Sequence, residues 1–231
     1  DGTAVYPDRY PVRSGDFRIH TLTEELELVH ELNMAHGRNV GVYPEIKRPA
    51  LHRAEGIDIA PQLLTELLAA GYKGRGDPVF VQCFDSAEVR RLRLELDCPY
   101  KLVQLIGDNS WRESDTDYDA LRRPDGIAGV AAVADGIGPH LSHLVEVDRV
   151  DGAPRITELA MLARDQGLLI HPYTFRADDV PPGFATFDEL VQFFVRDHDK
   201  FGFGRPTMAE TANCTVYSMP LTVDMSLGLL K

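Results

Sequence analysis

The sequence predicts an α/β protein in which parallel strands, surrounded by helices, form part of a (β/α) barrel. Short apolar runs typical of buried strands alternate with amphipathic helical segments along the chain. Polar residues gather where each run ends, as they do at the active face of a barrel. No Gly-rich phosphate-binding turn follows a strand, which disfavours a doubly wound open sheet but leaves it as the second candidate.

The helices are predicted from their spacing and their caps. Thr21 and Glu24 have the spacing of a capping box, and Gly37 stands where the first helix should end. Further helices are predicted over residues 58–70, 86–96 and 156–166, with a short Ala-rich helix before residue 133. A last helix is expected to begin at Thr186, whose capping partner is Glu189.

Five strand-like runs follow these helices, over residues 40–47, 79–84, 102–106, 133–139 and 168–173. The runs are mostly continuous in apolar residues, which indicates strands buried on both faces. A closed barrel requires eight strands, so we expect a partial TIM-type barrel over residues 1–199 and an atypical C-terminal tail over residues 200–231. Open barrel edges predict low stability or self-association of the isolated chain.

The composition narrows the choice of ligand. The 231-residue chain carries a net charge of -12, which disfavours nucleic acid and anionic membrane surfaces and favours a small polar ligand. No apolar run is long enough to cross a bilayer. Asp1 is not an initiator Met and no signal peptide follows it, so we expect the chain to begin within a longer protein.

Polar residues at the ends of the predicted strands form the candidate site. Residues two apart in a strand share a face, so Glu45 and Lys47 should point the same way. The strand-end residues are Glu45, Lys47, Gln82, Asp85, Asp135, His171, Tyr173 and Arg176. We expect Glu45, Gln82, Asp135 and His171 to lie near one common end of the sheet.

Five motifs occur in a fixed order along the chain. They are Tyr43-Pro44-Glu45-Ile46-Lys47, Gln82-Cys83-Phe84-Asp85, Leu102-Val103-Gln104-Leu105-Ile106, Ala134-Asp135-Gly136-Ile137-Gly138-Pro139 and His171-Pro172-Tyr173-Thr174. Together they resemble the motifs of bacterial glycerophosphodiester phosphodiesterases of the periplasmic type. The resemblance implies a barrel of the phospholipase C-like phosphodiesterase type and metal-dependent hydrolysis of glycerophosphodiesters to an alcohol and sn-glycerol 3-phosphate. It also implies calcium as cofactor, with magnesium possible, and a periplasmic or secreted location.

The resemblance implies roles for individual residues. Glu45 matches a carboxylate ligand of the metal. Independently of the resemblance, Lys47 shares the face of Glu45, which predicts that its ammonium contacts the substrate phosphate. The other implied substrate-binding residues are Gln82, Phe84, His171 and Tyr173. The alternatives are a Glu45–Lys47 ion pair at a strand end, barrel filling by Gln82 and Phe84, and a core role for His171. Trp111 is a candidate for the substrate rim, and Arg176 for an anion contact or a plain surface position.

Several motifs of the resembled family are not recognisable. Its His-Arg-Gly, Glu-x-Asp and His-Asp motifs, which supply the proton-transfer histidines and further metal ligands, have no match here, and no final strand is recognisable after Asp199. The catalytic residues are therefore unassigned, and we expect this chain to lack essential ones. Two alternatives follow: a non-catalytic remnant that binds phosphorylated glycerol compounds, and another barrel enzyme acting on a phosphorylated small molecule.

Overall fold

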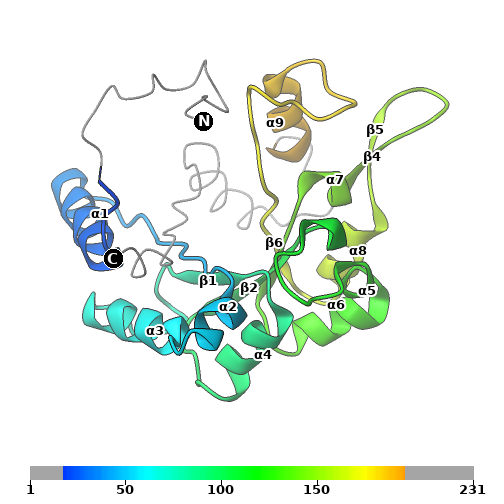
Figure 1. The fold of residues 1–231 in the computed structure, drawn as a ribbon. Coiled ribbons are helices and arrows are strands. Elements are labelled where there is room, and N and C mark those ends of the chain that lie inside the picture. The colour runs from blue at the N-terminus through cyan, green and yellow to red at the C-terminus, as the bar shows by residue number, and fades with distance from the viewer. Residues whose placement is uncertain (1–17, 196–231) are drawn as a thin grey trace, which may run out of the picture.

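The computed structural model describes residues 18–195 and contains a parallel sheet (Figure 1). The strands lie in the order β1 (Phe80–Cys83), β2 (Lys101–Ile106), β3 (Gly136–Pro139) and β6 (Leu169–Ile170). An extended segment at residues 42–46 continues the sheet beyond β1, through parallel bridges from Val42 to Val79 and from Glu45 to Gln82. The five predicted runs are thus confirmed as neighbouring parallel elements, in chain order and without the reversal of a doubly wound sheet.

The helices lie outside the curved sheet (Figure 1). Their bounds are α1 (Leu22–His36), α2 (Pro49–Ala54), α3 (Ile59–Ala69), α4 (Ser86–Leu94), the 3-10 turn η1 (Asn109–Trp111), α5 (Tyr118–Leu121), α6 (Pro124–Ala131), α7 (Leu141–Leu144), α8 (Glu158–Asp165) and α9 (Phe187–Val195). A hairpin of β4 (Val145–Val147) and β5 (Pro154–Ile156) projects from the body between α7 and α8. A closed barrel is not formed by the part of the chain that the structure describes.

The helix ends follow from their capping residues. At α1 the Thr21 hydroxyl accepts from the Glu24 amide at 3.3 Å, and the Glu24 carboxylate accepts from the Thr21 amide at 2.8 Å, which confirms the predicted capping box. Gly37 ends the helix with a φ of 58°, a left-handed conformation that suits glycine. The Asp85 carboxylate caps α4 through the amides of Ala87 and Glu88, so its polarity at the end of β1 serves the helix.

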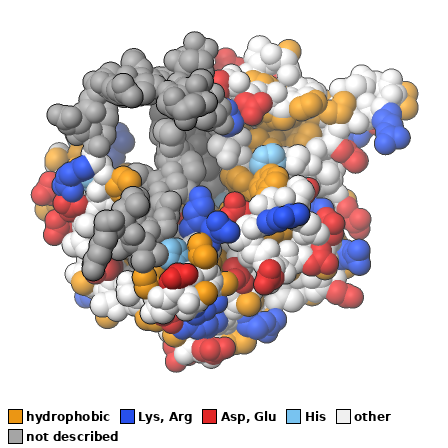
Figure 2. Space-filling view, viewed as in Figure 1, with side chains coloured by type: hydrophobic (Ala, Val, Ile, Leu, Met, Phe, Trp, Pro, Cys, Tyr) orange, Lys and Arg blue, Asp and Glu red, His pale blue; other side chains and the backbone are white. Residues whose placement is uncertain are grey.

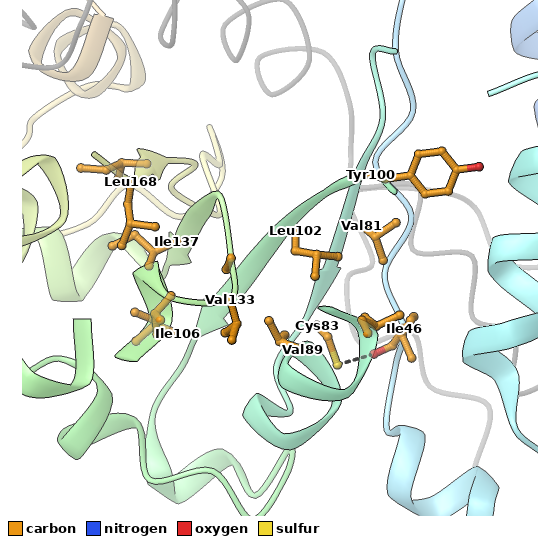
Figure 3. Close-up of a cluster of buried hydrophobic side chains, with 14 of the residues drawn as sticks. Ile46, Val81, Cys83, Val89, Tyr100, Leu102, Ile106, Val133, Ile137 and Leu168 are labelled. Atoms are coloured by element: carbon orange, nitrogen blue, oxygen red, sulfur yellow. Dashed lines mark hydrogen bonds between the residues drawn. The ribbon is translucent and has the colours of Figure 1, made fainter. Parts of the chain in front are cut away.

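The hydrophobic core lies between the sheet and the helices (Figure 3). Val81 and Cys83 of β1 contribute to it together with Leu102 and Ile106 of β2, and the Cys83 thiol donates to the Ile46 carbonyl at 3.1 Å. Burial raises the pKa of this thiol well above its usual value, in agreement with a structural cysteine. Because side chains alternate along a strand, the intervening residues of β1 and β2 point to the opposite, inner face.

The inner face is strongly curved. Five flat neighbouring strands would place the first and last elements roughly 19 Å apart, at about 4.8 Å per strand. Nevertheless the Tyr43 hydroxyl of the first extended segment lies 2.9 Å from Nδ1 of His171, which directly follows β6. The sheet must therefore bend around its inner face, as the sheet of a TIM-like barrel does.

The remaining expectations concern membrane-spanning helices, the domain boundary and the last helix. No helix within residues 18–195 is long and apolar enough to cross a bilayer. The predicted boundary between residues 199 and 200, and the tail beyond it, lie outside the described residues. The expected last helix is present as α9, where the Thr186 hydroxyl accepts from the Glu189 amide at 3.2 Å.

Candidate functional site

The carboxyl ends of the strands carry most of the predicted site residues. Glu45 bridges to Gln82 of β1, and Gln82 also donates to the Tyr43 carbonyl at 3.2 Å. Glu45 is a buried carboxylate, with 9% of its surface exposed. Lys47 lies two residues further along the same extended segment and is partly exposed. The structure therefore brings the first three candidates to neighbouring positions at one end of the sheet.

Asp135 does not belong to this end, so the prediction that placed it there is wrong. The run at 133–139 becomes a strand only from Gly136, and Asp135 therefore precedes β3 at the amino end of the sheet. Its carboxylate accepts from the Leu102 amide at 2.8 Å and from Arg93 at 2.9 Å, and it also pairs with Arg75. In barrel folds the amino end contributes stability, which suits this network.

His171 follows β6 and turns toward the inner face of the sheet. Its ring packs edge to face against Tyr43 and Phe80, with centroids 5.4 and 4.8 Å apart, and Lys101 lies over the Phe80 ring. Burial, with a smaller effect of the Lys101 charge, lowers the pKa of His171 to about 4. Near neutral pH the imidazole is uncharged, and its contacts are those of a residue that packs on the inner face of the sheet.

A row of aromatic rings lies beyond this layer, at the same carboxyl ends. Phe84 follows β1, Trp111 ends η1 after β2, His140 follows β3, and Tyr173 lies after β6. Centroids of successive rings are 5.8 Å apart for Phe84–Tyr173, 5.5 Å for Tyr173–His140 and 5.2 Å for His140–Trp111. We call Trp111, His140 and Tyr173 the aromatic wall. Figure 2 shows histidine atoms among hydrophobic side chains on the face from which the fold is viewed.

Local contacts fix each ring of the aromatic wall. The Tyr173 hydroxyl donates to the Ile106 carbonyl at 3.0 Å, and burial raises the pKa of this phenol far above its usual value. His140 Nδ1 accepts from the Ser142 amide at 3.3 Å. Gly107 leaves room for the indole, because a Cβ there would lie 2.8 Å from Cε3 of Trp111. The wall is thus held by contacts with the end of β2, with α7 and with Gly107, which directly follows β2.

Charged groups surround the aromatic wall. Glu45 and Glu113 raise the pKa of Tyr173 electrostatically, and Asp179 acts on His140. Arg122 lies close by, but its guanidinium is ion-paired with Asp119 and also contacts the His143 ring. The carboxylates near the rings therefore favour a cation as ligand over an anion.

Arg176, the candidate for an anion contact, lies in a local cluster of opposite charges. Its guanidinium pairs with Asp178 at 3.2 Å and with Asp179 at 3.3 Å. This pairing favours the plain surface role over an anion site.

A complete metal site is not formed by residues 18–195, where no group of three or more His, Cys, Asp or Glu side chains could hold an ion. Calcium usually takes six to eight oxygen ligands, and Glu45 supplies one carboxylate. The acidic loop after β2 has structural roles, since Asp117 caps α5 and Asp119 pairs with Arg122. The described residues alone therefore do not fit a calcium ion.

Sequence reasoning missed His140 and gave Trp111 only a tentative place at the rim. The signal for His140 was available, because it directly follows Pro139 at the end of the fourth predicted run. The motif containing this run drew attention to Asp135 instead, at the other end of β3.

Comparison with known proteins adds independent information. The model of the glycerophosphoryl diester phosphodiesterase family matches residues 3–196. The chain is 36% identical over 205 residues to a glycerophosphodiester phosphodiesterase of Haemophilus influenzae, covering 80% of this chain and 55% of the relative. For a glycerophosphodiester phosphodiesterase of Treponema pallidum the identity is 34% over 209 residues, covering 84% and 59%. Glycerophosphodiester phosphodiesterase GDPD6 of Arabidopsis thaliana is 29% identical over 189 residues, covering 74% and 49%. The chain thus spans about half the length of these curated relatives.

Proposed function

Since the chain belongs to the glycerophosphoryl diester phosphodiesterase family, we propose that it supplies the substrate-binding strand ends of an enzyme that hydrolyses glycerophosphodiesters to an alcohol and sn-glycerol 3-phosphate. The observation that carries this proposal is the buried Glu45 carboxylate, held in register beside Gln82 at the carboxyl end of the sheet. Active sites of barrel enzymes lie at that end.

Each neighbouring residue has a proposed task. The Lys47 ammonium, on the same side of the segment as Glu45, neutralises negative charge on the phosphodiester. Gln82, Phe84 and Tyr173 line the substrate pocket, and His171 supports it from the barrel interior through Tyr43. We assign no proton-transfer residue within residues 18–195, because His171 is engaged in the inner layer.

We further propose that Glu45 contributes one oxygen ligand to a divalent cation, calcium or in its place magnesium. Such an ion would polarise a phosphoryl oxygen when bound. The described residues supply too few ligands for it, so we route no step of the reaction through the ion. A periplasmic or secreted location belongs to the same proposal and rests on the sequence resemblance.

The second candidate is a non-catalytic module that binds phosphorylated glycerol compounds. It is favoured by one observation: aromatic rings at the carboxyl end of the sheet contact one another within residues 18–195, whereas no group of ion ligands is formed there. The two candidates differ in whether this chain turns over substrate.

The experiment measures release of glycerol 3-phosphate from glycerophosphocholine while calcium is titrated. It uses the 231-residue chain and a chimera completed with the matching flanking segments of the Haemophilus influenzae relative. In the chimera, Glu45→Gln should raise the calcium requirement about tenfold or more, because it removes one anionic ligand. Lys47→Ala should lower turnover about 10- to 100-fold with the calcium requirement kept.

The matched control is Lys73→Ala, which removes an exposed ammonium from the loop after α3. It should change neither turnover nor the calcium response. An unchanged calcium response in Glu45→Gln would overturn the ligand assignment. Calcium-dependent turnover by the 231-residue chain itself would refute the expectation that it lacks essential residues and would exclude the non-catalytic candidate.

A further inference from the structure

We propose that the aromatic wall of Trp111, His140 and Tyr173 binds a quaternary ammonium group, and so selects glycerophosphodiesters whose alcohol is a trimethylammonium alcohol. This inference rests on the proposed function, because it assigns the head group of the same substrate. It adds a specificity site to the catalytic end of the sheet, built from loops that follow β2, β3 and β6.

The ring geometry offers a corner suited to a rounded cation. The indole of Trp111 and the imidazole of His140 stand at 89° to each other, and the rings of His140 and Tyr173 at 69°. Trp111 is 43% exposed although it is the largest apolar side chain, so the residue is accessible to a ligand. Aromatic faces attract cations through the ring quadrupole, and tryptophan does so best.

The charge around the wall favours a cation. Glu45 and Glu113 act electrostatically on Tyr173, and Asp179 acts on His140. Burial lowers the pKa of His140, so the imidazole is neutral near pH 7 and does not repel a cation. Arg122, the nearby guanidinium, is ion-paired with Asp119.

Hydrogen bonding distinguishes quaternary from primary ammonium groups. A primary ammonium has three N–H donors, and each one that leaves water needs an acceptor. The Tyr173 hydroxyl is directed at the Ile106 carbonyl, and His140 Nδ1 is engaged by Ser142. A trimethylammonium group has no donor to satisfy, so it gains the ring contacts without this cost.

The position of the wall fits the rest of the substrate. Phe84 lies two residues beyond Gln82 and packs edge to face on Tyr173, with centroids 5.8 Å apart. Phe84 therefore connects the Glu45 and Gln82 end of the sheet with the wall. With the phosphate at Lys47, the ester arm that carries the alcohol would extend along Phe84 to Tyr173 of the wall.

The test uses the fluorescence of Trp111, the single tryptophan of the chain. Choline and tetramethylammonium, added to the 231-residue chain, should change the emission saturably, and ethanolamine should bind at least about threefold more weakly. Tyr173→Leu keeps the reporter and should weaken choline binding about three- to tenfold. Tyr173→Phe keeps the ring but loses the hydroxyl, so it should lose clearly less affinity for choline than Tyr173→Leu.

The matched control is Met161→Ala on α8, an apolar side chain that is 47% exposed, close to the exposure of Trp111. It should leave choline binding unchanged. Circular dichroism of each variant shows whether it has folded. The proposal is overturned if choline and ethanolamine give equal responses, if no saturable response occurs, or if Tyr173→Phe loses as much affinity as Tyr173→Leu.

Turnover of the chimera separates this inference from the proposed function. If glycerophosphocholine and glycerophosphoethanolamine are hydrolysed with equal kcat/KM, and Tyr173→Leu lowers both equally, the inference fails while the function stands. If the fluorescence selects choline but neither diester is hydrolysed, the function fails while the wall is supported. A preference for glycerophosphocholine that Tyr173→Leu removes supports both.

Discussion

The two ends of the parallel sheet use polar residues in different ways. At the amino end, Asp135 accepts from Arg93 and from the Leu102 amide and pairs with Arg75, so its charge is compensated by the protein itself. At the carboxyl end, Glu45 is buried beside Gln82 near a row of aromatic rings, one of which is the exposed Trp111. A polar residue next to a strand thus indicates ligand binding or stability according to the strand end it flanks.

Arg93 shows how complete the compensation is at the amino end. Besides Asp135, its guanidinium donates to the carbonyls of Val133 at 3.1 Å and Tyr100 at 3.1 Å, and to that of Cys98 at 2.6 Å. These carbonyls lie in the loops that lead into β2 and β3. Arg93 and Asp135 therefore connect the loops at the amino end of the sheet. Their hydrogen-bonding groups are largely used within the protein, which leaves few for a ligand.

The largest effect is expected from Asp135→Ala. It leaves Arg93 and the Leu102 amide without a partner in a site where the Asp135 side chain is only 13% exposed. We expect a loss of about 2–4 kcal/mol in the free energy of unfolding, measured by urea denaturation. Arg75→Ala, which removes a 58% exposed partner of the same carboxylate, should cost less than about 1 kcal/mol. Changed choline binding in folded Asp135→Ala would contradict the division between the two ends.

The second effect is a pH dependence that arises between the two ends, at His171. Its pKa is about 4 in the folded chain and near 6.5 when unfolded, because burial disfavours the charged ring. The contribution of the neutral His171 ring to the free energy of unfolding is therefore fully present above pH 6.5. It is lost as the pH falls from 6.5 toward 4, because in this range the unfolded chain binds a proton that the folded chain does not. The shift corresponds to roughly 3 kcal/mol.

Urea denaturation at steps between pH 7 and pH 4 measures this dependence. Burial also lowers the pKa values of His140 and His143, which contribute with the same sign. His171→Leu isolates the effect, since it should flatten the profile. A profile that keeps its slope in His171→Leu would show that this ring is not the buried neutral group.

The sequence was sufficient for the order of the elements. Apolar runs and helix caps are patterns of residues close together in the chain, so they can be recognised in the sequence. The continuous apolar runs predicted the five parallel elements correctly, and the caps Thr21 and Gly37 predicted the bounds of α1. Strand ends were less certain, because a strand begins where hydrogen bonding to its neighbour begins. Asp135 lies inside a predicted run but directly before Gly136, the first residue of β3. The prediction therefore assigned it to the carboxyl end of the strand, although it lies at the amino end.

The sequence predicted only those site residues that lie at the carboxyl end of a strand-like run. Glu45, Gln82, Phe84 and Tyr173 were identified because each stands at the end of a run. The aromatic wall depends on contacts between residues 29 to 33 positions apart, such as Trp111 with His140 and His140 with Tyr173, and no local pattern reveals these. Its composition could be seen only in the folded chain.

A smaller effect is expected from Gly107→Ala, which tests the carboxyl end. The new Cβ would lie 2.8 Å from Trp111 Cε3 and 3.2 Å from Phe84, so the partly exposed indole must move. We expect a loss of about 1–2 kcal/mol in stability and weaker choline binding by about threefold. Gly129→Ala on α6, where a Cβ meets nothing within 4 Å, is the matched control: it should leave choline binding unchanged and raise stability by about 0.5–1 kcal/mol, because alanine favours the helix interior. Full choline affinity in Gly107→Ala would mean that the position of the indole does not matter.

The smallest effect concerns the layer between the two ends. Tyr43→Phe keeps the ring contacts with Phe80 and His171 but removes the hydroxyl that lies 2.9 Å from His171 Nδ1. One buried hydrogen bond is worth about 1 kcal/mol, so we expect a loss of that size at pH 7 in urea denaturation. Tyr100→Phe at the amino end, which removes a 2.9 Å bond to the Tyr72 carbonyl, should cost a similar amount.

A double-mutant cycle distinguishes the two tyrosines. Combined with His171→Leu, Tyr43→Phe should show a coupling energy of about 1 kcal/mol, because the partner of its hydroxyl is already gone. Tyr100→Phe should add independently to His171→Leu, because it acts on a different bond at the other end of the sheet. A coupling energy near zero for the Tyr43 pair would mean that the contact across the inner face does not contribute to stability. The curvature that joins the first and last strand elements would then depend on the packing of rings alone.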